Sequence, residues 1–201
     1  MTRKQKQALT AIILSLAIVG IDQAIKVAVK TGMCLRESIH IADWFQILFT
    51  ENNGMAFGME VFDKWFLTSF RILAVIALVW YICRVVRQGA KWGYLICLTM
   101  IAAGAAGNIF DCLFYGMVFS PSTESVVSTI VPWGSGYSEL MLGKVVDMFY
   151  FPLLHWHMPD WVPIWGSQDC IFFSPIFNFA DASISCGVVA LILFYNQKVL
   201  R

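Results

Sequence analysis

The sequence predicts an all-α membrane protein with four transmembrane helices, a small β-sheet on its extracytoplasmic side and extended outer loops. Three observations support this fold class. The chain is 59% hydrophobic and only 13% charged, with a mean hydropathy of +0.70, which is too apolar for a soluble domain of 201 residues. Four apolar stretches have the roughly 20 residues that a helix needs to cross a bilayer core of about 30 Å. Basic residues gather on one side of these stretches.

The predicted spans cover residues 8–29, 64–86, 93–115 and 176–197, within a single polytopic domain over 1–201. The basic start "MTRKQKQ" before an apolar run is also typical of a signal peptide. However, Asp22 and Lys26 follow with no small-residue cleavage site, so we interpret 8–29 as a retained span. The small residues of "AAGAAG" in the third span predict close helix packing.

The basic residues set the predicted orientation. Three precede the first span, three fill the connection between the second and third, and two follow the fourth: Arg3, Lys4, Lys6, Arg84, Arg87, Lys91, Lys198 and Arg201. Short loops rich in Lys and Arg stay in the cytoplasm. We therefore expect both termini in the cytoplasm and the loops 30–63 and 116–175 outside.

The outer loops predict some structure of their own. Residues 31–63 contain β-prone runs and a turn at "ENNG", which indicate a small sheet. Residues 117–144 indicate an irregular or partly β insertion. Residues 148–175 are dense in aromatic side chains, which is typical of a segment at the level of the lipid headgroups.

Polar residues from separate segments are expected at one depth. With a helical rise of about 1.5 Å per residue, the acidic residues of three spans all fall near the outer edge of the bilayer. An acidic residue of the outer loop, in "KVVDM", and three amides belong to the same layer. The set is Asp22, Asp111, Asp147, Asp181, Asn52, Asn108 and Asn178. Ionisable groups at membrane depth are functional candidates.

Sequence spacing groups some of these residues into pairs, and each pair has more than one possible role. Asp22 and Lys26 are four residues apart, which favours an internal ion pair with a structural or a catalytic role. The pairs Asn108/Asp111 and Asn178/Asp181 are three apart, so each lies on one helix face. The amides either bridge helices or contact substrate.

Asp147 and Asp181 are the strongest catalytic candidates, because neither has a cation four residues away in its own segment. Two carboxylates held close together share one proton near neutral pH. The ionised partner then takes a proton from water as it attacks a peptide carbonyl, and the protonated partner stabilises the oxyanion. This pattern indicates an aspartic protease working at the wet rim of the bilayer.

Other function classes have weaker support. Six cysteines include no C-x-x-C pair, so metal and thiol-redox chemistry are not indicated, and a net charge of +1 gives no basis for nucleic-acid binding. His155 and His157 are either paired metal ligands or interfacial residues. A Cys34–Cys170 disulfide is left open. A proton- or cation-coupled transporter and a purely structural subunit remain rival interpretations.

Five blocks, in order along the chain, resemble the signature motifs of lipoprotein signal peptidase, the signal peptidase II family. The likeness extends from the first predicted span to the last. The blocks are "DQAIK" (Asp22–Lys26), "NNGMAFG" (Asn52–Gly58), "GAAGNIFD" (Gly104–Asp111), "VVDM" (Val145–Met148) and "FNFADASI" (Phe177–Ile184).

The resemblance implies an aspartyl endopeptidase of the bacterial cytoplasmic (inner) membrane, with its active site at the outer face. Such an enzyme removes signal peptides from prolipoproteins, cutting before a diacylglyceryl-modified cysteine. It implies a β-cradle, no cofactor and no metal. The implied partners are prolipoproteins and membrane lipids, without nucleic acid, and we expect a monomer.

The resemblance also implies roles for single residues. The catalytic dyad falls on Asp147 and Asp181, and Asp22 and Lys26 match a mainly structural block. The substrate-binding positions of the family fall on Asn52, Gly54, Asn108, Asp111 and Asn178.

The sequence departs from the family pattern in two places. Cys112 stands where the family usually has an arginine near the substrate, and we hypothesise that Arg71 or Lys144 supplies that charge. The segments 117–144 and 148–175 are longer than in compact members, and we expect them to form a lid over the cleft or a platform on the membrane.

Overall fold

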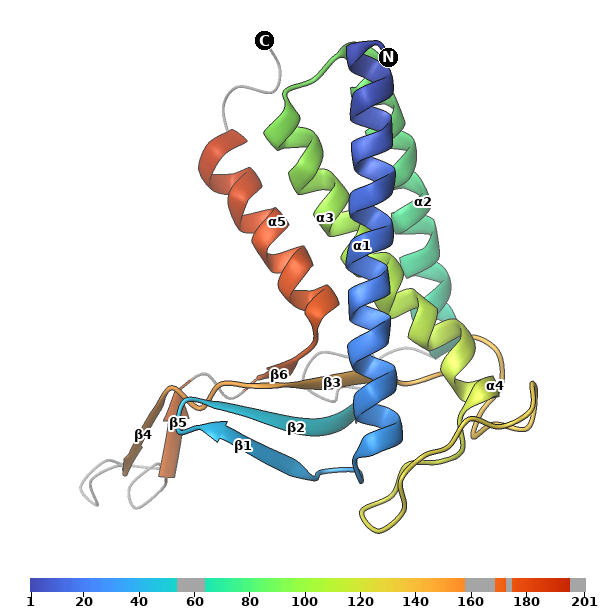
Figure 1. Cartoon of the computed structure of the whole chain (residues 1–201), viewed down its shortest axis with the longest axis vertical. Helices are drawn as coiled ribbons and strands as arrows, with labels where there is room; N and C mark the ends of the chain where they lie inside the picture. Colours follow the sequence, from blue (N-terminus) through green and yellow to red (C-terminus); the bar gives the residue numbers. More distant parts are fainter. Residues whose placement is uncertain (54–63, 158–168, 173–174, 196–201) are drawn as a thin grey trace.

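Long helices stand side by side in the computed structural model, and a sheet lies across one end of them (Figure 1). The structure describes residues 1–53, 64–157, 169–172 and 175–195. The long helices are α1 (Arg3–Gly32), α2 (Lys64–Gln88), α3 (Trp92–Phe110) and α5 (Phe179–Tyr195). The start of α1 and the last turns of α5 lie at the end away from the sheet (Figure 1).

Three helical runs in the described part of the chain are long and apolar enough to cross a membrane. They are α1, α2 and the run Trp92–Val118, in which α3 continues through a π-helix, η2 (Asp111–Tyr115), into the short α4 (Gly116–Val118). α5 is apolar but has 17 described residues. The sequence predicted helix from residue 176. Instead Ile176 and Phe177 form a strand, because they pair with Tyr150 and Phe149.

α3 is the central helix, packed against α1, α2 and α5. Its glycines allow the closest approach. A Cβ added at Gly104 would lie 2.4 Å from the carbonyl oxygen of Ala180 in α5. A Cβ added at Gly187 in α5 would lie 2.8 Å from the carbonyl oxygen of Cys97 in α3. Real Cβ atoms do not come this close to backbone, so small residues are required where the two helices meet, as the "AAGAAG" run predicted.

The sheet at the end of the helices is antiparallel, with strand order β1-β2-β3-β6. It contains β1 (Ser38–Ala42) and β2 (Phe45–Asn52), where the sequence predicted a small sheet, which is thereby confirmed. It also contains β3 (Val145–Tyr150) and β6 (Ile176–Phe177), which come from far along the chain. A separate hairpin is formed by β4 (Leu154–His157) and β5 (Asp169–Phe172).

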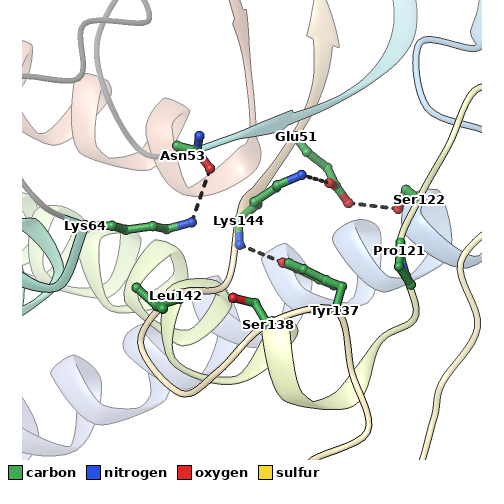
Figure 2. Close-up of a pocket in the computed structure, with 9 residues that line it drawn as sticks. All are labelled: Glu51, Asn53, Lys64, Pro121, Ser122, Tyr137, Ser138, Leu142 and Lys144. Carbon is green, nitrogen blue, oxygen red and sulfur yellow. Dashed lines mark hydrogen bonds and ion pairs between the residues drawn. The ribbon is translucent and has the colours of Figure 1, made fainter.

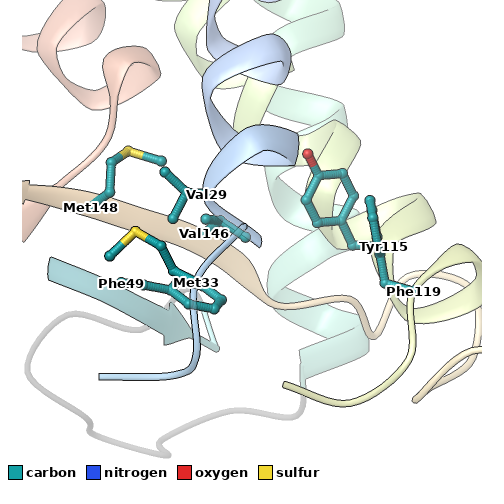
Figure 3. Packing of buried hydrophobic residues seen from close by; sticks show 7 residues of the cluster. All are labelled: Val29, Met33, Phe49, Tyr115, Phe119, Val146 and Met148. Carbon is teal, nitrogen blue, oxygen red and sulfur yellow. The ribbon is translucent and has the colours of Figure 1, made fainter. Parts of the chain in front are cut away.

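An apolar cluster fixes the sheet to the helices (Figure 3). It joins the last turns of α1, the strands β2 and β3, and the run from η2 to Phe119. Its members are Val29, Met33, Phe49, Tyr115, Phe119, Val146 and Met148. Phe49, Val146 and Met148 are fully buried, and this burial provides the main force that holds the sheet in place. The inner strand β3 is thereby held against the helices.

The insertion 117–144 is largely irregular, as predicted. One isolated β-bridge joins Phe119 to Ile130. Trp133 packs on Phe114 of η2, with ring centroids 6.1 Å apart. The insertion therefore rests on the C-terminal end of the long helical run that starts at Trp92.

Candidate functional site

Asp147 lies on the central strand β3, where its side chain is 4% exposed. Two amides bind its carboxylate. Asn178 Nδ2 donates to Oδ1 at 2.7 Å, and Asn52 Nδ2 donates to Oδ2 at 3.3 Å. Asn52 comes from the neighbouring strand β2 and Asn178 from the residue before α5. Three segments distant in sequence therefore meet at this carboxylate.

Asp181 lies in the first turn of α5 and forms a reciprocal cap with Asn178. The backbone N–H of Asp181 donates to Asn178 Oδ1 at 2.9 Å, and the backbone N–H of Asn178 donates to Asp181 Oδ2 at 3.4 Å. This is the capping-box arrangement, which binds two backbone donors that a helix start leaves open. The cap explains why an amide and an acid stand at the beginning of an apolar helix.

Asn108 of α3 links the cap to a buried cation. Its Nδ2 donates to Asp181 Oδ1 at 2.7 Å. Its Oδ1 accepts from Asn178 Nδ2 at 3.1 Å and from Lys26 Nζ at 2.8 Å. Because Lys26 is only a donor, it fixes which end of the Asn108 amide faces Asp181. Both predicted catalytic carboxylates are thus bound by amides that touch each other.

The predicted pair Asp22 and Lys26 is part of a larger buried cluster. Lys26 Nζ lies 2.9 Å from Asp22 and 2.7 Å from Asp111, and all three side chains are fully buried. Such a group is stable in the interior only because opposite charges and hydrogen bonds satisfy it. The sequence predicted the contact with Asp22 but not the contact with Asp111.

The two acids of this cluster also hold the backbone next to the predicted dyad. Asp22 Oδ1 accepts the backbone N–H of Ala180, the residue before Asp181, at 2.9 Å. Asp111 Oδ2 accepts the backbone N–H of Val146, the residue before Asp147, at 3.4 Å. One buried ion cluster therefore positions both chain segments that carry the predicted dyad.

Sequence reasoning missed two members of the site. Gln23 Nε2 donates to Asp111 Oδ1 at 2.8 Å, and the Tyr115 hydroxyl donates to Gln23 Oε1 at 3.0 Å. Gln23 stands inside the "DQAIK" block, so its place beside Asp22 was the available signal. Tyr115 gave none, because an aromatic residue in an apolar helix is usually a core residue.

The electrostatics of Asp147 fit a shared proton. Burial raises the pKa of the Asp147 carboxyl to about 7, and the negative charge of Asp181 acts in the same direction. The hydrogen bonds from Asn178 and Asn52 oppose this rise. The two carboxyl groups are therefore close enough to influence each other's ionisation, and Asp147 exchanges a proton in the physiological range.

The other predicted site residues include the two candidates for the positive charge expected near the substrate. Arg71 of α2 is half-buried, and its Nη1 lies 4.0 Å from Cys112 Sγ, at the position where an arginine was expected. Lys144 instead contacts Glu51 Oε2 at 3.1 Å. Arg71 is thus a cation beside Cys112. Gly54 lies outside the described residues, as do the side chains of His155 and His157.

Comparisons with known proteins cover most of the chain. The family model for signal peptidase (SPase) II matches residues 14–196. A lipoprotein signal peptidase of Porphyromonas gingivalis is 44% identical over 196 residues, covering 97% of this chain and 85% of the relative. One of Amoebophilus asiaticus is 35% identical over 188 residues, covering 90% and 75%.

A likeness to solved structures concerns the fold. A bacterial membrane enzyme solved by the in meso method aligns over 94% of both chains, with a TM-score of 0.62 and 23% identity. A second structure with the same description has a TM-score of 0.60. The arrangement of apolar helices over a small sheet is therefore also found in a membrane enzyme.

Proposed function

Because the chain belongs to the signal peptidase II family, a family of membrane proteases, we propose that it is an aspartyl endopeptidase. Its substrates are prolipoproteins that carry a diacylglyceryl-modified cysteine, and it cuts directly before that cysteine. The observation that carries the mechanism is the position of Asn178, which binds Asp147 with its amide nitrogen and caps the helix start at Asp181.

In this mechanism Asp147 holds the proton that the pair shares, and Asp181 acts as the base. Asp181 takes a proton from water as the water attacks the peptide carbonyl. Asp147 donates a hydrogen bond to the developing oxyanion and then helps to protonate the leaving amine. A pKa of about 7 suits Asp147 to both steps, since a general acid works best near the operating pH.

Amides and one cation complete the proposed site. Asn52 and Asn178 hold the carboxylate of Asp147, and Asn108 holds that of Asp181. Asp111 acts behind them by holding Lys26 and the backbone of β3. Arg71, beside Cys112, provides the positive charge that anchors the substrate. Gly54, outside the described residues, stays a predicted substrate-binding residue.

The proposed topology has four spans in one domain, with α5 as the fourth. Both termini lie in the cytoplasm. The sheet and the dyad lie at the outer face of the inner membrane, where water and a lipid-embedded precursor are both within reach. We propose that the enzyme acts as a monomer. It uses no cofactor.

The decisive experiment incubates the purified protein with a diacylglyceryl-modified precursor and identifies the products by mass spectrometry. We expect cleavage directly before the modified cysteine. We expect Asp147→Asn and Asp181→Asn each to lower the rate by at least about 1,000-fold, because neither proton transfer can proceed.

Two controls make the result interpretable. The thermal unfolding of each variant must stay close to that of the unchanged protein. Asp43→Asn, at an exposed aspartate on the turn between β1 and β2, must retain full activity. Undiminished cleavage in either dyad variant would exclude this dyad.

A further inference from the structure

A second polar site lies beside the proposed dyad, in a cavity of about 430 Å³ (Figure 2). The cavity begins where β2 ends and β3 starts. Asn53, which lines it, directly follows Asn52, and Lys144 stands three residues before Asp147. Three residues of extended chain span about 10 Å, so a peptide held at the dyad reaches the cavity within a few residues.

Positive charge predominates around this cavity. Lys64, at the start of α2, and Lys144 both line it (Figure 2). Arg71 lies within electrostatic range of Lys64. The carboxylate that lines the cavity, Glu51, already has its partners. Lys30 and Ser122 bind its Oε1, and Lys144 binds its Oε2 at 3.1 Å.

The two lysines of the wall keep donors for a guest. Lys64 Nζ donates to Asn53 Oδ1 at 3.3 Å, and the side chain of Lys144 remains 40% exposed. An ammonium group has three donors, and the hydrogen bonds to described residues use one donor of each lysine. Glu51 remains ionised, because its neighbours lower its pKa despite burial, but Lys30 behind it neutralises that charge.

We propose that this cavity binds an acidic side chain of the precursor, in the first residues after the modified cysteine. The proposal rests on the function proposed above and adds a preference within the substrate class. The segment before the cleavage point is apolar and belongs in the bilayer. The segment after the cleavage point extends toward water. A carboxylate in that segment can therefore reach the cavity without being buried in lipid.

The lining favours a peptide carboxylate over a lipid phosphate. Among the described residues that line the cavity, seven carry a polar or charged group, and the exceptions are Pro121 and Leu142. A phospholipid headgroup would bring two acyl chains that need an apolar wall beside it. Most of the lining residues, including Tyr137 and Ser138, belong to the insertion 117–144. We therefore expect this preference in proteins that have the long insertion.

The test compares precursor peptides that are identical except after the modified cysteine, with Asp or Asn at the second to fourth positions. We expect kcat/KM to be about five- to tenfold higher for the Asp peptides, the size of one or two partly screened charge contacts. The ratio should fall below about twofold in K64Q/K144Q and persist in K64R/K144R. Lys91→Gln, at the exposed start of α3 far from the sheet, should leave rate and ratio unchanged.

The outcomes separate the proposals. Equal rates for Asp and Asn peptides in the unchanged enzyme, or a preference that survives in K64Q/K144Q, would overturn the acidic-residue site. If phosphatidylglycerol in the vesicles changes kcat/KM through Lys64 and Lys144, while the Asp and Asn peptides are cleaved equally fast, the cavity binds lipid. That result would also overturn the acidic-residue site. If the unchanged enzyme cleaves neither peptide, the proposed function itself fails, and this inference falls with it.

Discussion

At the scale of single residues, Asn178 connects the two predicted catalytic acids. Its spacing from Asp181 in the sequence predicted that both lie on one helix face. Instead α5 begins at Phe179, and Asn178 contacts Asp181 as the cap before the helix. Its bond to Asp147 could not be predicted from spacing, because Asp147 lies 31 residues away on a strand that is placed by tertiary pairing. The local sequence pattern thus identified the residues of the site, but their contacts depend on tertiary packing.

Substitutions at this residue should separate the cap from the contact with the dyad. Serine is also a good helix cap, so Asn178→Ser should unfold at nearly the same temperature as the unchanged protein. It loses the amide donor to Asp147, and we expect kcat/KM to fall about 10- to 100-fold. Asn178→Ala loses both and should be about 1 kcal/mol less stable. Thermal unfolding and cleavage assays check this, and full activity of Asn178→Ser would refute the positioning role.

At the scale of elements, the dyad depends on how closely α5 approaches α3. Gly104 faces Ala180, which directly precedes Asp181. The run of small residues predicted close packing, but the partner helix could not be identified from one span alone. The π-helix η2, which contains Asp111 and Cys112, had no signal in the sequence either. Such turns arise from local crowding and are common near functional sites.

Enlarging Gly104 should therefore disturb catalysis through the packing of the two helices. In Gly104→Ala the new methyl group would collide with the Ala180 carbonyl, pushing the start of α5 away from β3. We expect a loss of about 1–3 kcal/mol in stability and at least about tenfold in kcat/KM. Gly20→Ala in α1, with nothing within 4 Å, is the matched control and should equal or exceed the original stability. Equal activity in both variants would contradict this account.

At the scale of the whole molecule, the distribution of basic residues and the position of the sheet support the proposed orientation in the membrane. The basic segments around Lys4 and Arg87 lie at the end of the helices away from the sheet (Figure 1). Composition and charge predicted four spans, and three helical runs of the described residues are long enough to cross a membrane. Composition and charge could not predict that β3 and β6 join β1 and β2 in one sheet, because strand pairing over such distances in sequence depends on tertiary packing.

Labelling with a membrane-impermeant thiol reagent should reveal this orientation in intact cells. In a background without the six native cysteines, Glu124→Cys in the outer insertion should react directly, and Lys4→Cys only after the membrane is permeabilised. Both positions are exposed, and Glu124 forms an exposed ion pair with Arg36, so the substitution costs little stability. Reaction of Lys4→Cys in sealed cells would reverse the proposed topology.

The most direct measurement of the shared proton is the titration of the Asp147 carboxyl by infrared difference spectroscopy, with Asp147→Asn as the blank. A protonated carboxyl band should disappear with a midpoint near pH 7. Because the charge of Asp181 raises the pKa of Asp147, Asp181→Asn should move that midpoint to lower pH. A midpoint near pH 4, or one that Asp181→Asn leaves unchanged, would show that the two acids do not act as a pair.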